Sequence, residues 1–155
     1  MGSFRDSAAQ LRALCRTDLV RATDLRDRPE RFFEAHRLLA RHTVEHGPGF
    51  WIRFTVHYNL FAGTVVAVGS DAQVEALATY QAAGQLGCFS LTERRAGVQS
   101  GLVVETTADW DHARGAFVLH TPDEGARKNW ISQGFVADKT VQACARGGGG
   151  RWRCA

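Results

Sequence analysis

Residues 87–101 read GCFSLTERRAGVQSG, a strand-like segment of small and apolar residues that runs into a polar turn containing glycine. Small residues at the end of a strand allow backbone N–H groups to approach a planar ligand closely. We therefore take this stretch as the candidate ligand-binding segment. It divides the chain into a first part with helical periodicity and a second part with the pattern of strands.

The part before residue 87 is predicted to be largely helical. Apolar residues recur at helical spacing in residues 7–16 and 28–45, where Phe32, His36 and Leu39 form one stripe. Asp27 is predicted to cap the second of these helices, with Glu30 as its capping-box partner. Ser70 and Gln73 predict a capping box at the start of a further helix. Residues 51–68 are ambiguous, because they alternate like a strand yet could equally form a buried helix.

The part after residue 87 is predicted to form short strands. Four segments are rich in Val, Thr, Leu or Phe, namely 87–91, 102–107, 116–120 and 139–145. Two intervening segments, 109–112 and 121–125, have the composition of turns. Helices followed by strands predict an α+β fold or a two-domain chain, and not alternating βαβ units.

The charge of the chain is unevenly distributed. The 155 residues carry a formal net charge of +3, but residues 1–138 carry −1 and residues 139–155 carry +4. A nucleic-acid-binding domain needs a basic stripe on a folded face, so no nucleic-acid partner is predicted. No apolar run approaches the roughly 20 residues of a membrane helix, and no targeting signal is recognised. Residues 146–155, RGGGGRWRCA, are predicted to be a disordered tail.

Two other patterns bear on possible sites. The four cysteines are widely spaced, which favours reduced and mostly buried thiols. Residues 42–46, HTVEH, match the His-x-x-Glu-His pattern, so a zinc site at His42, Glu45 and His46 is a minor alternative. The glycines that follow would end the helix beside His46, and we predict no metal site here.

Several motifs give the chain a family resemblance. Leu91-Thr92-Glu93 with Ala96-Gly97 resembles the Leu-Thr-Glu-x-x-x-Gly-Ser stretch of acyl-CoA dehydrogenase and acyl-CoA oxidase flavoproteins. The segments that look more like the oxidase branch are YNLFAGT at 58–64, ETTA at 105–108, FVLHTP at 117–122 and KNWI at 128–131. Residues 29–40 are similar to the N-terminal oxidase helix, and the ordered match runs from about residue 24 to residue 145.

The resemblance implies a fold and an activity. It implies an N-terminal helical domain at 1–85 and a partial, barrel-like middle β-domain at 86–145, with residues 51–68 helical. The implied enzyme is an FAD-dependent acyl-CoA oxidase or dehydrogenase that oxidises the α–β carbon bond of fatty acyl-CoA. A homodimer and a peroxisomal or mitochondrial location are also implied.

The resemblance also implies site residues. Phe89, Leu91 and Thr92 would lie along the flavin, with the Thr92 hydroxyl and amide directed to its N5 and O4 edge. Trp130, Ile131 and Ser132 match the second flavin-contacting stretch of the family. Val98 falls where the family has a serine near the acyl-CoA thioester. The catalytic base would be a carboxylate in a C-terminal helical domain, so no catalytic residue is expected in this chain.

Departures from the family pattern lead to an alternative. Arg94 and Arg95 would place two cations beside the cofactor, and Ser132-Gln133-Gly134 stands where oxidases often have a glycine pair after the tryptophan. The glycine-rich tail leaves the family pattern altogether. The alternative is therefore a truncated, non-catalytic remnant that exposes strand edges and apolar surface.

Overall fold

The computed structural model of the chain describes residues 4–42, 47–96 and 104–146. The chain divides into two compact units. We call Met1–Phe89 with Ser132–Val141 the helical unit, and Ser90–Ile131 with Gln142–Ala155 the strand unit.

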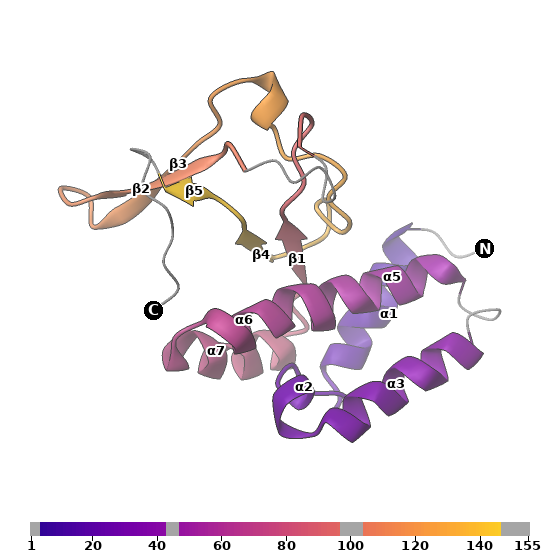
Figure 1. Cartoon of the computed structure of the whole chain (residues 1–155). Coiled ribbons are helices and arrows are strands. Elements are labelled where there is room, and N and C mark those ends of the chain that lie inside the picture. Colours follow the sequence, from indigo (N-terminus) through magenta and orange to yellow (C-terminus); the bar gives the residue numbers. More distant parts are fainter. Residues whose placement is uncertain (1–3, 43–46, 97–103, 147–155) are drawn as a thin grey trace. The chain divides into compact units, whose positions relative to one another are not determined.

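The helical unit contains the helices that precede residues 91–93, which we call the LTE motif (Figure 1). They are α1 (Phe4–Cys15), α2 (Asp24–Asp27), α3 (Pro29–Arg41), α5 (Pro48–Thr55), the π-helix η1 (Val56–Ala62), α6 (Gly63–Val68) and α7 (Asp71–Ala82). Two short strands, β1 (Gly87–Ser90) and β4 (Lys139–Gln142), pair with each other. The core is shared by α1, α3, α5 and η1, and its buried members include Leu11, Phe32, Phe54, Tyr58 and Leu86.

The ambiguous segment 51–68 is helical, as the family resemblance implies. In Figure 1, α5, η1 and α6 follow one another as one nearly continuous helical rod. Residues two apart on a helix face different sides, so an alternating pattern fits a helix only if several of its sides are buried. That condition holds in η1, where Val56, His57, Tyr58, Phe61 and Ala62 are all buried.

One of the two predicted capping boxes is confirmed. The Ser70 hydroxyl accepts from the Gln73 amide and the Gln73 side chain accepts from the Ser70 amide, so α7 begins as predicted. The prediction for Asp27 is wrong. Asp27 is the last residue of α2, and α3 begins after Arg28 with no side-chain cap. At the start of the short α2, the buried Asp24 carboxylate accepts from the Arg21 amide, a local bond that the periodicity does not reveal.

The strand unit contains a three-stranded sheet in the order β3-β2-β5. β2 (Thr107–Asp111) pairs antiparallel with β3 (Ala116–His120) and parallel with β5 (Ala145–Arg146), and the short 3-10 helix η2 (Glu124–Ala126) follows β3. The sheet and the helical unit confirm the predicted α+β class, and the described strands form no closed barrel.

The predicted strand at 102–107 and the predicted turn at 109–112 are misplaced. Residues 107–111 form β2, and the turn lies after Asp111. Trp110 lies opposite Phe117 with ring centroids 5.0 Å apart, an aromatic pair that favours this register. The Asp111 carboxylate accepts from two amides of the turn, which ends at Gly115 with φ of 60°. A left-handed residue of this kind suits a hairpin, and glycine adopts it without strain.

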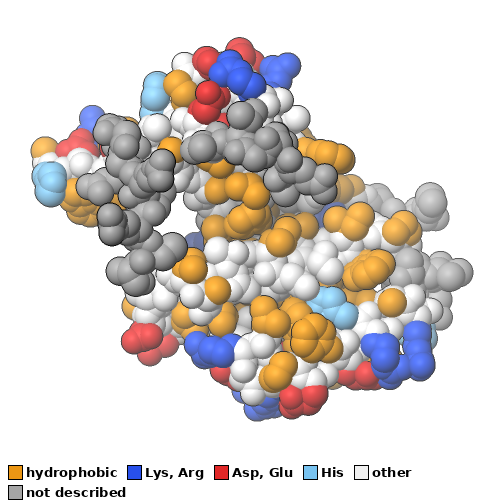
Figure 2. Space-filling view, viewed as in Figure 1, with side chains coloured by type: hydrophobic (Ala, Val, Ile, Leu, Met, Phe, Trp, Pro, Cys, Tyr) orange, Lys and Arg blue, Asp and Glu red, His pale blue; other side chains and the backbone are white. Residues whose placement is uncertain are grey.

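Several large apolar side chains of the helical unit stay exposed. They belong to α3, α5 and η1 and comprise Phe33, Leu38, Trp51, Ile52 and Leu60. Figure 2 shows hydrophobic side chains on this view of the helical unit, with charged side chains gathered toward its lower edge. Among the described residues, none of the helices combines the length and the apolar character needed to cross a membrane.

Candidate functional site

The residues predicted to contact a flavin lie in both units. Phe89 is the third residue of β1, in the helical unit, and is half-buried. Ser132 also belongs to the helical unit and is exposed. Leu91, Thr92, Trp130 and Ile131 belong to the strand unit, whereas Val98 lies outside the described residues.

An ion pair brings the two stretches of the strand unit together. Glu93 and Lys128 form an isolated antiparallel bridge, and the Lys128 Nζ lies 3.0 Å from the Glu93 Oε1. The Asn129 amide donates to the Thr92 carbonyl at 2.9 Å. Residues 91–93 and 128–131 are therefore joined by this isolated bridge, whose two residues lie 35 positions apart.

The Glu93–Lys128 ion pair is fully hydrogen-bonded. The Glu93 carboxylate also accepts from the amides of Glu105 and Thr106, at 2.9 and 3.0 Å. The Lys128 ammonium also donates to the carbonyls of Leu91 and Ala143, at 3.1 and 2.8 Å. Burial alone would raise the pKa of Glu93, but the amide donors and the ammonium outweigh it and lower the pKa to about 2. Glu93 therefore stays ionised and holds the two stretches together.

Thr92 has donors to offer a ligand. Its carbonyl is occupied by Asn129, but its amide and its hydroxyl have no hydrogen-bond partner among residues 4–42, 47–96 and 104–146. The side chain is half-buried, next to the buried Glu93. Two donors that find no partner in the described part of the chain, next to a partly buried ion pair, suit an acceptor edge of a planar ligand.

Trp130 has an unusual conformation. Its φ is 57°, in the left-handed region, and its side chain is 89% exposed. Left-handed backbone at a bulky residue costs on the order of 1–3 kcal/mol, and such strain clusters at ligand-binding sites. An exposed indole on a strained backbone offers a flat apolar surface next to Asn129, the residue that bonds to Thr92.

The two cations that follow the LTE motif are neutralised within the strand unit. Arg94 pairs with Glu124 at 3.0 Å, and Arg95 pairs with both Glu105 and Asp123 at 2.9 Å. Their amides donate to the carbonyls of Arg127 and Gly125. Both guanidinium groups are therefore paired with carboxylates, and the two residues fix the turn.

A buried polar network in the helical unit is not evident from the sequence. The Gly87 amide donates to His57 Nδ1 at 3.0 Å, which leaves the ring proton on Nε2, 3.4 Å from the Cys15 Sγ. The Tyr58 hydroxyl approaches the same sulfur at 3.7 Å. Burial lowers the pKa of His57 to about 4 and raises the pKa of the Cys15 thiol. With this tautomer, Nε2 cannot take a proton from Cys15, so the pair is structural.

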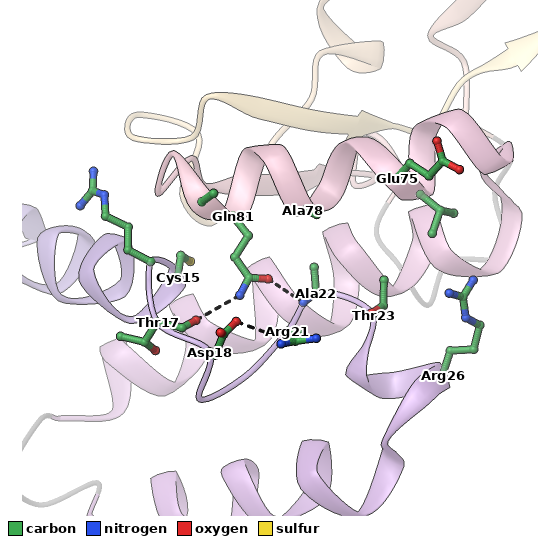
Figure 3. Close-up of a pocket in the computed structure, with 13 residues that line it drawn as sticks. Cys15, Thr17, Asp18, Arg21, Ala22, Thr23, Arg26, Glu75, Ala78 and Gln81 are labelled. Atoms are coloured by element: carbon green, nitrogen blue, oxygen red, sulfur yellow. Dashed lines mark hydrogen bonds and ion pairs between the residues drawn. The ribbon is translucent and has the colours of Figure 1, made fainter.

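The helical unit also contains a pocket of about 450 Å³ next to α7 (Figure 3). Its wall includes the connection from α1 to α2, held to α7 by Gln81. The Gln81 side chain accepts from the Ala22 amide at 2.8 Å and donates to the carbonyls of Thr17 and Val20. None of the predicted flavin-contact residues lines this pocket, and we assign its polar groups to holding the loop.

The zinc hypothesis draws no support from the described part of the chain. His42 follows the last residue of α3, while Glu45 and His46 lie outside the described residues. Within the described ranges, no three His, Cys, Asp or Glu side chains are grouped so that they could hold a metal ion. The thiols of Cys15 and Cys88 are buried.

Comparisons with known proteins point to one family. Acyl-coenzyme A oxidase 2, peroxisomal, from Arabidopsis thaliana is 30% identical over 125 residues, which cover 77% of this chain and 17% of that protein. Acyl-coenzyme A oxidase 2 from Yarrowia lipolytica is 40% identical over 88 residues, which cover 54% of this chain and 12% of that protein. No protein-family model matches the chain.

The fold comparison agrees. The crystal structure of acyl-CoA oxidase 1 from Yarrowia lipolytica superposes with a TM-score of 0.56 and 25% identity, covering 74% of this chain and 20% of that one. The structure of acyl-CoA oxidase 3 from the same organism gives a TM-score of 0.56 and covers 90% of this chain and 24% of that one. Because the two are only 24% identical in sequence, this likeness supports the fold alone. The chain spans 17% or less of the length of the curated relatives quoted above. The curated homologues of the chain are acyl-CoA oxidases, and the solved structures quoted above that share its fold are acyl-CoA oxidases too.

Proposed function

We propose that this chain supplies part of the flavin site of an FAD-dependent acyl-CoA oxidase, which oxidises the α–β carbon bond of a fatty acyl-CoA. The observation that carries the proposal is the Glu93–Lys128 ion pair. It holds Thr92, whose amide and hydroxyl have no partner within the described ranges, beside the stretch that leads to Trp130. The names of the relatives, all acyl-CoA oxidases, supply the substrate class.

The residues present fit a flavin. The ring carries acceptors along one edge and has flat apolar faces, which need hydrogen-bond donors and a planar apolar partner. The Thr92 amide and hydroxyl are such donors, and the exposed indole of Trp130 is such a partner. Leu91 and Ile131, both half-buried, flank these two residues in the chain and would exclude water from the ring.

When bound, FAD supplies the hydride acceptor at its N5 atom. The Thr92 hydroxyl and amide would hold the N5 and O4 edge and stabilise the negative charge that reduction brings. Phe89 and Ser132, in the helical unit, and Val98 are assigned to the cofactor and the acyl-CoA by the family resemblance. Glu93 is unsuited to act as the base, because hydrogen bonds hold its carboxylate and lower its pKa to about 2.

A second candidate is a non-catalytic chain of the same family. The outer strand of the three-stranded sheet, β3, pairs on one side only, with β2, among the strands that the structure describes. Three apolar side chains of this hairpin are strongly exposed: Trp110, Phe117 and Leu119, at 48%, 61% and 59%. Exposed apolar strand edges are typical of sheets that further strands complete. This candidate predicts no oxidation of acyl-CoA even if flavin binds.

The test is reconstitution of the chain with FAD, followed by desalting and measurement of the flavin visible absorbance retained. We expect retention by the wild type, and about tenfold weaker binding after Thr92→Val, because a donor to the ring is lost. Thr79→Val, at an exposed position on α7, is the matched control and should bind like the wild type. A wild-type chain that retains no flavin contradicts the proposal.

Addition of a long-chain acyl-CoA to the loaded chain tests the second candidate. Bleaching of the flavin absorbance under nitrogen contradicts it. A loaded chain that does not bleach fits both candidates, because the resemblance places the base outside this chain, and flavin retention then carries the first proposal.

A further inference from the structure

Gln133 is a buried residue in a conformation that glutamine rarely adopts. Its φ is 73°, in the left-handed region, and its side chain is only 3% exposed. It belongs to Ser132-Gln133-Gly134, which stands where the resembling oxidases often have a glycine pair, and glycine is the residue that adopts this conformation without strain. The side-chain hydrogen bonds of Gln133 must therefore offset the free energy that its left-handed backbone costs.

The side-chain contacts of Gln133 lie within the helical unit. Its Nε2 donates to the Gly87 carbonyl at 2.8 Å, and its Oε1 accepts from the Arg53 Nη1 at 3.1 Å. Arg53 is 5% exposed and donates only to uncharged oxygens among the described residues, the others being the Ser7 hydroxyl and the Phe4 carbonyl. A hydrogen bond from a buried cation polarises the Gln133 amide and strengthens its own donation to Gly87.

Gly87 is held on both sides. Its amide donates to His57 Nδ1 at 3.0 Å and its carbonyl accepts from Gln133. The Phe61 ring lies against its Cα, so that a Cβ there would overlap the ring. The first residue of β1 is thereby fixed, and Phe89 follows two residues later.

We propose that Gln133 is a positioning residue that sets β1, and with it Phe89 and its own neighbour Ser132, for contact with the flavin. The inference rests on the proposed function, because Phe89 and Ser132 are the flavin contacts assigned to the helical unit. Gln133 has the same kind of role in the helical unit as the Glu93–Lys128 ion pair has in the strand unit. Each contact joins two stretches of its own unit that the resemblance assigns to the flavin.

The test uses the full 155-residue chain without and with FAD. Gln133→Gly relieves the left-handed backbone but removes the bond to Gly87, and Gln133→Glu keeps an acceptor for Arg53 but cannot donate to the carbonyl. We expect both variants to exchange the amide hydrogens of residues 87–90 about tenfold faster than the wild type. With FAD bound, both should shift the visible spectrum of the flavin, a signature that a change in stability alone does not move.

Gln81→Ala is the matched control, because it also removes a buried glutamine that bonds to backbone groups. It should speed exchange in residues 17–22 and leave residues 87–90 and the flavin spectrum unchanged. Unchanged exchange in β1 after Gln133→Gly, or equal acceleration after Gln81→Ala, overturns the inference. A wild-type chain that binds no flavin instead overturns the proposed function, and exchange at residues 87–90 then decides whether Gln133 fixes β1.

Discussion

The ammonium of Lys128 lies 3.0 Å from the carboxylate of Glu93, whose side chain is completely covered, and every hydrogen of that ammonium has an acceptor. Removing one partner of a buried pair leaves the other charge uncompensated, which costs about 3–5 kcal/mol. We therefore expect Glu93→Gln to lower the free energy of unfolding by about 3 kcal/mol. Urea denaturation of the chain, followed by circular dichroism, measures it.

Glu124→Gln is the control for that substitution. Glu124 pairs with Arg94 and Arg127, but its side chain is 68% exposed, and exposed ion pairs contribute about 0–1 kcal/mol. A loss after Glu124→Gln as large as that after Glu93→Gln would show that burial of the pair is not what matters.

Acid should weaken the same contact. The pKa of Glu93 is lowered from 4.5 to about 2, so its ionised form is favoured by folding. A carboxylate with a lowered pKa contributes stability that is complete above the unfolded value and is lost as the pH falls through the folded value. We expect the free energy of unfolding to fall between pH 4.5 and pH 2, and less steeply in Glu93→Gln. Parallel curves for the two proteins would contradict this assignment.

The buried imidazole of His57 should act in a higher pH range. Burial lowers its pKa from 6.5 to about 4, so folding favours the neutral ring. Stability from this group is complete above pH 6.5 and is lost as the pH falls toward 4. We expect His57→Asn, whose side-chain oxygen can accept from the Gly87 amide, to flatten the pH dependence in this range. The free energy of unfolding is measured with urea in small pH steps from neutrality down to the folded pKa. If its slope against pH is the same in His57→Asn as in the wild type, His57 is not the source of the pH dependence.

A methyl group at Gly87 should be poorly tolerated. The Cβ would overlap the buried Phe61 ring, and overpacking of a core costs about 1–3 kcal/mol. A methyl group at Gly49, in α5, would meet no atom within 4 Å, so Gly49→Ala should instead stabilise the chain by about 0.5–1 kcal/mol. Thermal unfolding of the two variants should therefore shift in opposite directions. A Gly87→Ala variant that melts with the wild type would show that Phe61 can move aside.

The helices that the sequence predicts best are those whose signals are local. The capping box at Ser70 and the stripe of Phe32, His36 and Leu39 depend on residues three or four apart, and the structure contains both. His36 is half-buried and bonded to the Phe32 carbonyl and to Asn59, as expected for a helix residue packed against a neighbour. The segment 51–68 cannot be assigned from its own pattern, and the family resemblance resolves it.

Strand positions are predicted less well, because strand pairing depends on distant partners. The prediction for β3 is confirmed, but that for β2 is displaced, since the Trp110–Phe117 pair is visible only once the two strands are opposite each other. The resemblance identifies the motif residues Thr92 and Trp130, but it does not identify the residues that hold them.

The amino-acid sequence by itself determined the α+β class, the main helices and the identity of the motif residues, because these depend on neighbours in the chain and on resemblance. Only the tertiary structure decided how the motif residues are held. Glu93 meets Lys128 across 35 residues, and Gln133 meets Gly87 across 46. The first contact is a partly buried ion pair and the second is a buried hydrogen bond. The geometry of both arises from packing, and the spacing of the residues along the chain does not predict them.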